Sequence, residues 1–458
     1  MVKRYRHIHF VGIGGAGMSG IAEVLHNMEY FVTGSDVRAS EVTQHLAGLG
    51  VRVFIGHEPE HVRGADVVVR SSAVGLDNSE VVAARQHLIP VIPRAEMLAE
   101  LMRLKYGVAV AGTHGKTTTT SMLAIVLAKG GLDPTVVIGG RLSGLGTSAK
   151  LGGGDFLVAE ADESDGSFLK LSPTVAVVTT IDAEHLDYYR DLTHIQETFL
   201  QFINKVPFYG SAILCLDQEN IQALLPGVEK RFITYGLRTQ ADITAREIMH
   251  QGMRSEFVVV ARQEVLGKFR LRVPGTHNVS NALAAVAVGL DLDIEPDVIR
   301  DALEEFAGVD RRFQVKGEAR GILVVDDYGH HPAEIRATLN AAKDGFGRRV
   351  VAIFQPHRYT RTHYLLREFF TAFYEADVLI VTEVYAAGEP VIPGVSGGQI
   401  AEGAIEHGHR SVTFLADKEA IPEFVLSVLQ PGDLVITMGA GDIWQVGEEI
   451  LRRLATGS

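Results

Sequence analysis

The sequence has a single cysteine, Cys215, among its 458 residues. No disulfide can therefore form within the chain, which is typical of proteins of a reducing compartment. Long apolar runs are also missing, since runs such as 282–290 fall far short of the ~20 residues that span a bilayer. The first residues lead directly into a strand pattern, without the apolar stretch of a signal peptide. We therefore expect a cytoplasmic protein with no membrane partner.

The chain has no basic excess. Its 43 Lys and Arg residues stand against 56 Asp and Glu, a formal charge of −13, whereas nucleic-acid-binding proteins normally present a net basic face. We therefore expect no nucleic-acid partner. Anionic small molecules are still compatible with this charge, because local loops hold phosphates. Proline is scarce, 15 residues against 48 glycines, and this ratio favours an α/β architecture with many tight turns.

The alternation of apolar strands and helical segments starts three times along the chain. Because 458 residues exceed one compact core, several domains are expected. We predict a Rossmann-like nucleotide-binding domain (1–106), a P-loop ATPase-type central domain (107–313) and a C-terminal Rossmann-like α/β domain (314–458). Between 241 and 273 the apolar period changes to about two, which predicts an antiparallel ribbon added to the central domain.

A glycine-rich loop, GIGGAG (12–17), follows the first predicted strand and precedes a helix. It matches the GxGxxG pattern, and Asp36 lies nineteen residues beyond Gly17. Such glycines let backbone N–H groups approach a diphosphate at the helix N-terminus, while the acid can bind sugar hydroxyls. NAD or FAD is the familiar ligand, but any diphosphate nucleotide suits this geometry, and so does a tight turn with no ligand. The motif alone leaves the ligand open.

A second glycine loop, AGTHGKTT (111–118), also lies between a predicted strand and a helix. It is a shortened P-loop, because Val110 stands where the full pattern has glycine. The chemistry is retained: backbone amides cradle phosphates, Lys116 balances their charge, and the Thr117 hydroxyl can ligate Mg²⁺. This loop is the strongest single signal in the sequence, and it predicts an ATP site.

Charged and polar side chains follow several other predicted strands. Glu160 and His185 end strands of the central part, and Arg358 and Arg361 end one of the third part. Carboxylates at such edges can reach a metal ion, and paired arginines suit a carboxylate ligand. Each group by itself would equally fit a solvated acidic turn or a surface ion pair.

Taken in order, these segments resemble the Mur ligases, and the resemblance covers nearly the whole chain. The matching motifs are GTHGKTT (112–118), EADESD (160–165), EHLD (184–187), HNVSN (277–281) and DYGHHP (327–332). The first loop, GIGGAGMS (12–19), and DDYGHHP (326–332) are similar to the alanine-adding branch of that family. The branch that recycles a murein tripeptide usually has a Gly-Ile-Cys-Gly-Thr loop, which this chain lacks.

The resemblance implies ATP-dependent ligation of L-alanine to the muramoyl carboxylate of UDP-N-acetylmuramate, through an acyl phosphate, in peptidoglycan precursor synthesis. Mg²⁺, or alternatively Mn²⁺, is the implied metal, and we expect a monomer or a weak homodimer. Several relatives hold a second metal with a carbamylated lysine. No lysine lies between His185 and Lys205 here, so we predict no carbamate.

Three other functions are compatible with part of the sequence. A tripeptide-recycling ligase would use the same sugar nucleotide. An NAD-dependent oxidoreductase would leave the second glycine loop without a role. A P-loop switch that makes no product would release phosphate from ATP without needing UDP-N-acetylmuramate or an amino acid.

The resemblance also assigns residues, each on a position that matches a family motif. Predicted catalytic residues are Lys116, Glu160 and His185, and predicted metal ligands are Thr117, Glu160 and His185. Predicted ATP contacts are Gly112, Thr113, His114, Gly115, Lys116, Thr117, Thr118, His277, Asn278, Arg312 and Asp327. Predicted contacts to UDP-N-acetylmuramate are Gly12, Gly14, Gly15, Ala16, Gly17, Met18, Ser19, Asp36, His57, Ser71 and Ser72. Tyr328, His330, Arg358 and Arg361 are predicted to bind the amino acid and the intermediate.

Overall fold

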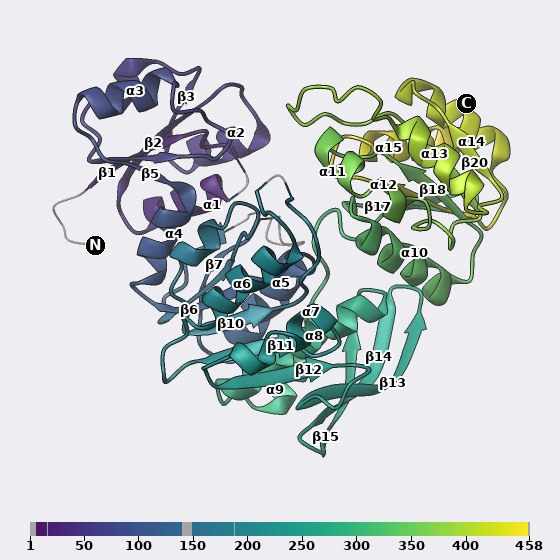
Figure 1. The fold of residues 1–458 in the computed structure, drawn as a ribbon, viewed down its shortest axis with the longest axis horizontal. Helices are drawn as coiled ribbons and strands as arrows, with labels where there is room; N and C mark the ends of the chain where they lie inside the picture. Colours follow the sequence, from purple (N-terminus) through teal and green to yellow (C-terminus); the bar gives the residue numbers. More distant parts are fainter. Residues whose placement is uncertain (1–5, 16, 140–148, 187, 457–458) are drawn as a thin grey trace. The chain divides into compact units, whose positions relative to one another are not determined.

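The structure is a computed structural model that describes residues 6–15, 17–139, 149–186 and 188–456 (Figure 1). The chain forms two compact units, each described here by itself. The first comprises Met1–Asp182, Asp191–Thr244 and Asn281–Leu303, and the second comprises Ala183–Arg190, Ala245–Ser280 and Glu304–Ser458. The described residues contain three sheets, of five, ten and six strands. The prediction of three successive α/β parts is thereby confirmed, whereas the exact domain boundaries stay a prediction.

The five-stranded sheet is entirely parallel, in the order β3-β2-β1-β4-β5. The chain crosses from β1 to β2 on one side and returns to β4 on the other, so the topological switch lies between β1 and β4. Ligands bind at such switch points, outside the carboxyl ends of the strands. The elements are β1 (His7–Val11), α1 (Met18–Asn27), β2 (Phe31–Asp36), α2 (Glu41–Gly48), β3 (Arg52–Ile55), β4 (Val67–Arg70), α3 (Ser79–Gln86), β5 (Val91–Pro93) and α4 (Arg94–Met102).

The ten-stranded sheet has the order β15-β14-β13-β12-β11-β10-β6-β9-β7-β8. Its central strands are parallel and buried, and β14 and β15 pair antiparallel, as the change of period predicts. The strands are β6 (Tyr106–Ala111), β7 (Thr135–Val137), β8 (Ala149–Lys150), β9 (Phe156–Glu160), β10 (Val175–Val178), β11 (Ser211–Cys215), β12 (Phe232–Gly236), β13 (Ile243–Gln251), β14 (Arg254–Ala261) and β15 (Glu264–Leu271). The helices are α5 (Lys116–Lys129), α6 (Leu192–Ile203), α7 (Glu219–Gln222), α8 (Thr276–Asp291) and α9 (Pro296–Glu305).

The six-stranded sheet has the order β16-β17-β21-β18-β19-β20, and two apolar clusters cover it. Its edge strand β16 is antiparallel to β17, and the sequence analysis missed it because QVKGEA has no apolar run. The strands are β16 (Gln314–Ala319), β17 (Ile322–Asp327), β18 (Val350–Phe354), β19 (Val378–Val381), β20 (Val412–Phe414) and β21 (Leu434–Met438). The helices are α10 (Pro332–Phe346), α11 (Tyr359–Tyr364), α12 (Leu366–Phe369), α13 (Gly397–Glu406), α14 (Ile421–Val428) and α15 (Trp444–Thr456). Within the described ranges, no helix combines the length and apolar character that crossing a membrane requires.

Candidate active site

The first glycine loop occupies the switch point of the five-stranded sheet. The backbone N–H groups of Gly12 and Ile13 both donate to the Ser35 carbonyl at 2.9 Å. Gly12 has a φ of +80°, and a Cβ added there would lie 3.0 Å from the Cβ of Ser71, which follows β4. Glycine is therefore required by both the backbone conformation and the close approach of the two strand ends.

Asp36 is held against this loop. Its Oδ2 accepts a hydrogen bond from the Gly14 N–H at 2.9 Å. The loop thus binds a carboxylate of its own chain through an N–H group of the kind that a diphosphate would use. Among the other predicted sugar-nucleotide contacts, Met18 and Ser19 are buried at the start of α1 and Ser72 is exposed. Ala16 lies outside the described residues.

His57 belongs to a buried polar cluster beneath the same strand ends. Its Nδ1 lies 3.0 Å from the Ser35 hydroxyl and 3.2 Å from Glu80 Oε2. Glu80 is fully buried, and its other oxygen lies 2.6 Å from His61 Nδ1. Burial alone would raise the pKa of Glu80, but the His9 ring 3.7 Å away and the hydrogen bond from the Ser35 hydroxyl outweigh it and bring that pKa to about 2. His57 was predicted from the sequence, whereas Glu80, the acid that orients it, was not.

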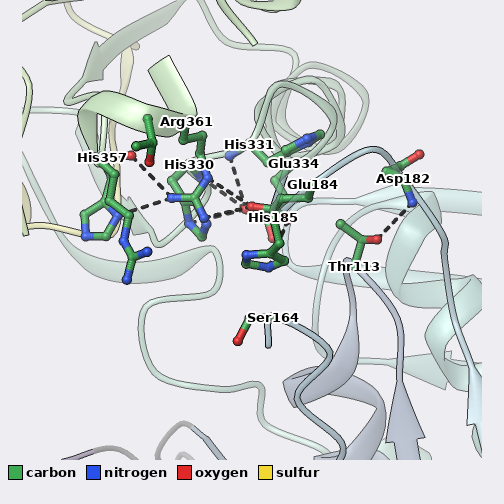
Figure 2. Close-up of polar contacts among 12 residues, drawn as sticks. Thr113, Ser164, Asp182, Glu184, His185, His330, His331, Glu334, His357 and Arg361 are labelled. Atoms are coloured by element: carbon green, nitrogen blue, oxygen red, sulfur yellow. Dashed lines mark hydrogen bonds and ion pairs between the residues drawn. The ribbon is translucent and has the colours of Figure 1, made fainter. Parts of the chain in front are cut away.

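The second glycine loop is braced against the end of β10. The Thr113 N–H donates to the Thr180 carbonyl at 3.0 Å, and the His114 N–H donates to the Thr180 hydroxyl at 2.8 Å. The Thr113 hydroxyl accepts from the Asp182 N–H at 2.9 Å (Figure 2). Gly115 caps α5 in a left-handed conformation, and a Cβ there would lie 2.6 Å from Asn281 Oδ1. Contacts with the segment after β10 thus hold the loop in shape.

Lys116 forms the charged centre of this loop. Its ammonium donates to the carbonyls of Gly112 at 2.5 Å and Thr113 at 3.2 Å, and to Glu163 Oε1 at 2.8 Å. The Glu163 side chain is 4% exposed, so this carboxylate neutralises the lysine in a largely dry environment. A nucleotide phosphate would compete with Glu163 for the same ammonium. Glu163 lies within the quoted EADESD motif, yet no role was predicted for it.

Glu160 lies beside the phosphate loop because β9 pairs with β6 in the register Val110–Glu160. Its Oε1 accepts from the Gly139 N–H at 2.9 Å. Together with the Thr117 hydroxyl at the start of α5, it offers the hard oxygen donors that Mg²⁺ prefers. No group of three or more His, Cys, Asp and Glu side chains in the described part of the chain is arranged to hold a metal. His185 belongs to the second unit, so its predicted partnership with Glu160 stays a prediction.

In the second unit, Arg361 on α11 forms an ion pair with Glu184, which lies far from it in the sequence. Its Nε and Nη2 donate to Glu184 Oε1 at 2.9 and 2.8 Å (Figure 2). Its Nη1 lies 3.3 Å from His357 Nδ1. The sequence predicted Arg361 as part of an arginine site but assigned nothing to Glu184. The signal was the EHLD motif, in which only the histidine was given a role.

Two histidines beside Arg361 are neutral: His330, a predicted contact, and His357, for which no role was predicted. Burial, reinforced by the Arg361 charge, lowers the pKa of His330 to about 3 and that of His357 to about 4. His330 Nδ1 lies 3.0 Å from the Tyr328 carbonyl. Because a carbonyl only accepts, Nδ1 carries the proton and Nε2 keeps a lone pair. The site therefore contains arginine cations and imidazoles that act as neutral dipoles.

These histidines predict a loss of stability in acid. A folded-state pKa of about 3 for His330 lies below the ordinary value, so the unfolded chain binds the extra proton first. The free energy of unfolding should therefore fall as pH drops from about 6.5 towards 4, by about 1–2 kcal/mol for this residue by pH 5. His330→Gln should flatten that slope in urea titrations at several pH values. Replacing the exposed His87 by glutamine should leave the slope as it is in the wild type. Equal slopes in the two variants would contradict the low pKa of His330.

The remaining predicted ATP contacts of the second unit are tied into its own structure. Asp327 is 4% exposed, and its oxygens accept from the N–H groups of Phe313 and Gly329, both at 2.7 Å. Arg312 stacks on Tyr328, with its guanidinium carbon 5.3 Å from the ring centre. Burial, and then the Arg312 charge, lower the pKa of His277 to about 4. The Asn278 amide donates to the Pro274 carbonyl at 2.7 Å. Their contact with a nucleotide stays a prediction.

Three protein-family models match the chain, in the order of its three sheets. Residues 7–106 match the model described as Mur ligase family, catalytic domain; 110–289 match the Mur ligase middle domain; and 311–441 match the Mur ligase, glutamate ligase domain. The UDP-N-acetylmuramate–L-alanine ligase of Geotalea uraniireducens is 60% identical over 454 residues, covering 99% of each chain. That of Syntrophotalea carbinolica is 62% identical over 98% of each chain.

Two solved structures match the fold of this chain over nearly its whole length. The UDP-N-acetylmuramate–alanine ligase of Thermotoga maritima has a TM-score of 0.83 at 30% identity, covering 99% of this chain and 100% of that one. A murein peptide ligase of Psychrobacter arcticus has a TM-score of 0.72 at 26% identity, covering 98% of each chain. The predicted three-part fold is thereby confirmed. With three family domains in order and full-length relatives at about 60% identity, the chain belongs to the Mur ligase family.

Proposed function

We propose that the chain ligates L-alanine to the muramoyl carboxylate of UDP-N-acetylmuramate, converting ATP to ADP and phosphate in peptidoglycan precursor synthesis. The observation that carries this proposal is the 60% identity, over 99% of both chains, to a ligase of that name. A second relative, 62% identical over 98% of both chains, has the same name, which favours the single amino acid over the tripeptide as substrate. The cytoplasm, where such soluble precursors would be made, is part of the proposal, as is a monomeric or weakly dimeric state.

The reaction needs several anions to be brought together without repulsion. The muramoyl carboxylate oxygen attacks the γ-phosphorus of ATP, ADP leaves, and an acyl phosphate forms. The alanine ammonium first loses a proton, the neutral amine attacks the acyl carbon, and the tetrahedral intermediate loses a second proton and expels phosphate. Neither step proceeds at a useful rate unless positive charge and hydrogen-bond donors stabilise the transferring groups.

The proposed roles follow from the contacts in each part. Gly12–Ser19 and the switch point would hold the diphosphate of the sugar nucleotide, with Gly14 N–H released from Asp36. Lys116 would exchange Glu163 for the phosphates and stabilise the transferring phosphoryl group. Arg361 would bind the carboxylate of alanine, with Arg358, Tyr328 and His330 beside it.

A divalent cation fits the oxygen donors of Thr117 and Glu160, with His185 proposed for a second one. Mg²⁺ suits the two oxygens, and Mn²⁺ also tolerates an imidazole nitrogen. When bound, the metal would neutralise charge on the phosphate oxygens. The chain's own contribution is to place Glu160 at the strand end next to the phosphate loop.

Phosphate release tests the proposed function. ATP and UDP-N-acetylmuramate should release phosphate with L-alanine, and mass spectrometry should detect UDP-N-acetylmuramoyl-L-alanine. L-serine and glycine should be poorer, and L-alanyl-γ-D-glutamyl-meso-diaminopimelate should give no product. Release that requires neither sugar nucleotide nor amino acid would indicate a P-loop switch instead, and product from the tripeptide alone would indicate the recycling activity.

A further inference from the structure

The ion pair between Glu184 and Arg361 is largely removed from solvent. Their side chains are 9% and 11% exposed, and two guanidinium nitrogens share one carboxylate oxygen at 2.8 and 2.9 Å. One of the Arg361 nitrogens also donates to the His357 carbonyl at 3.3 Å. A desolvated ion pair contributes little to stability compared with apolar packing, whereas losing one partner is strongly unfavourable. Its position in this unit therefore suggests a role beyond holding the fold together.

A small cavity opens beside the pair. Its lining includes both charged side chains together with His185, Arg358, Thr360 and Tyr364, all within the second unit. The space open to the centres of water-sized molecules is about 30 Å³, room for about two waters. The charged groups of a small zwitterionic ligand could take the place of such waters, and one positive and one negative group match the two facing charges.

We propose that Glu184 binds the α-ammonium group of the incoming amino acid while Arg361 binds its α-carboxylate. The zwitterion would insert into the existing pair, so that one ion pair becomes two and neither buried side chain loses its counter-charge. This inference rests on the proposed function, which assigns Arg361 to the amino acid. It adds a specificity-determining residue, Glu184, for which no role was predicted.

The insertion predicts a particular selectivity. A ligand with a carboxylate but no amine, such as propionate, would place a second carboxylate beside that of Glu184 in a largely desolvated site, which is unfavourable. Alaninamide keeps the amine but brings no carboxylate for Arg361, so it should bind more weakly than alanine while its binding still depends on Glu184. A merely structural ion pair would show no such dependence on the charges of the ligand.

The test compares Glu184→Gln with Glu368→Gln, which removes the same charge at an exposed position seven residues after Arg361. At saturating ATP and UDP-N-acetylmuramate, Glu184→Gln should raise the KM for L-alanine ten- to a hundredfold, as expected for a lost charge-assisted contact. The inhibition constant of alaninamide should rise in parallel. That of propionate should stay unchanged or fall. The KM values for ATP and UDP-N-acetylmuramate should stay within about twofold, and Glu368→Gln should match the wild type throughout.

Other outcomes overturn the inference. An unchanged KM for alanine in Glu184→Gln would do so, and so would an equal rise for alanine and propionate, because that identifies a structural pair. Glu184→Asp keeps the charge and should restore part of the discrimination between alanine and propionate. This variant tests the inference even if Glu184→Gln is poorly folded. A Glu184→Asp variant that restores no discrimination would overturn the inference. If the wild-type chain forms no product from alanine, the proposed function fails and this inference with it, whereas an active wild type with an unshifted Glu184→Gln overturns this inference alone.

Discussion

Replacing Lys116 by alanine is expected to lower the rate of ligation at least a hundred- to a thousandfold while UDP-N-acetylmuramate binding stays near the wild-type affinity. Removing one preorganised donor to a developing charge commonly has a rate effect of about 10²–10³, and here the donor is a full cation. The sugar-nucleotide site is assigned to the switch point of the five-stranded sheet, whereas Lys116 begins α5 after β6. Ligation should therefore be lost without a loss of sugar-nucleotide binding.

The measurement needs a control for the acid that Lys116 neutralises. Because Glu163 is buried against the ammonium, the single change leaves a carboxylate without its counter-charge and should also lower stability. Adding Glu163→Gln should recover the melting temperature but not the activity. Lys129→Ala, at the exposed far end of the same helix, should leave both unchanged. Calorimetric titration of the sugar nucleotide into each variant completes the test, and loss of that binding in a folded Lys116→Ala would contradict the two-loop assignment.

Replacing Gly112 by alanine is expected to lower the free energy of unfolding by about 2–5 kcal/mol, as the sum of strain and overpacking, and to abolish nucleotide binding. Gly112 has a φ of +136°, which disfavours any side chain. A Cβ there would press on the Thr179 hydroxyl and lie 2.9 and 3.0 Å from the Thr180 N and O atoms. Those threonines also brace Thr113 and His114, so the loop would have to shift as a whole.

Gly131 provides the matched control. It also has a positive φ, +79°, but an added Cβ would meet nothing within 4 Å. Gly131→Ala should therefore lower the free energy of unfolding only by the backbone strain, about 1–2 kcal/mol, and leave ATP binding intact. Urea unfolding of both variants, with nucleotide binding measured in parallel, separates strain from the clash. Equal losses of stability would mean that the contact with β10 is not what requires glycine at position 112.

The glycine loops and the strands before them were predictable from the sequence because their causes are local. Gly12 and Gly115 both have a positive φ at the turn from strand to helix. Side chains disfavour this backbone conformation for steric reasons within the residue itself, so glycine marks the turn in the sequence. Strands such as β6 and β18 are buried on both faces and therefore have continuous apolar runs. The strand β16 has no such run, because it is an edge strand with a partly exposed pattern.

The partners of the predicted cations were decided by the tertiary structure alone. Lys116 meets Glu163 across 47 residues, and Arg361 meets Glu184 across 177. A sequence pattern shows the periodicity within one helix or strand. It does not show which strand ends become neighbours at a sheet edge. The acids that neutralise these cations are therefore visible only in the folded chain, because burial and close approach act between segments that lie far apart in the sequence.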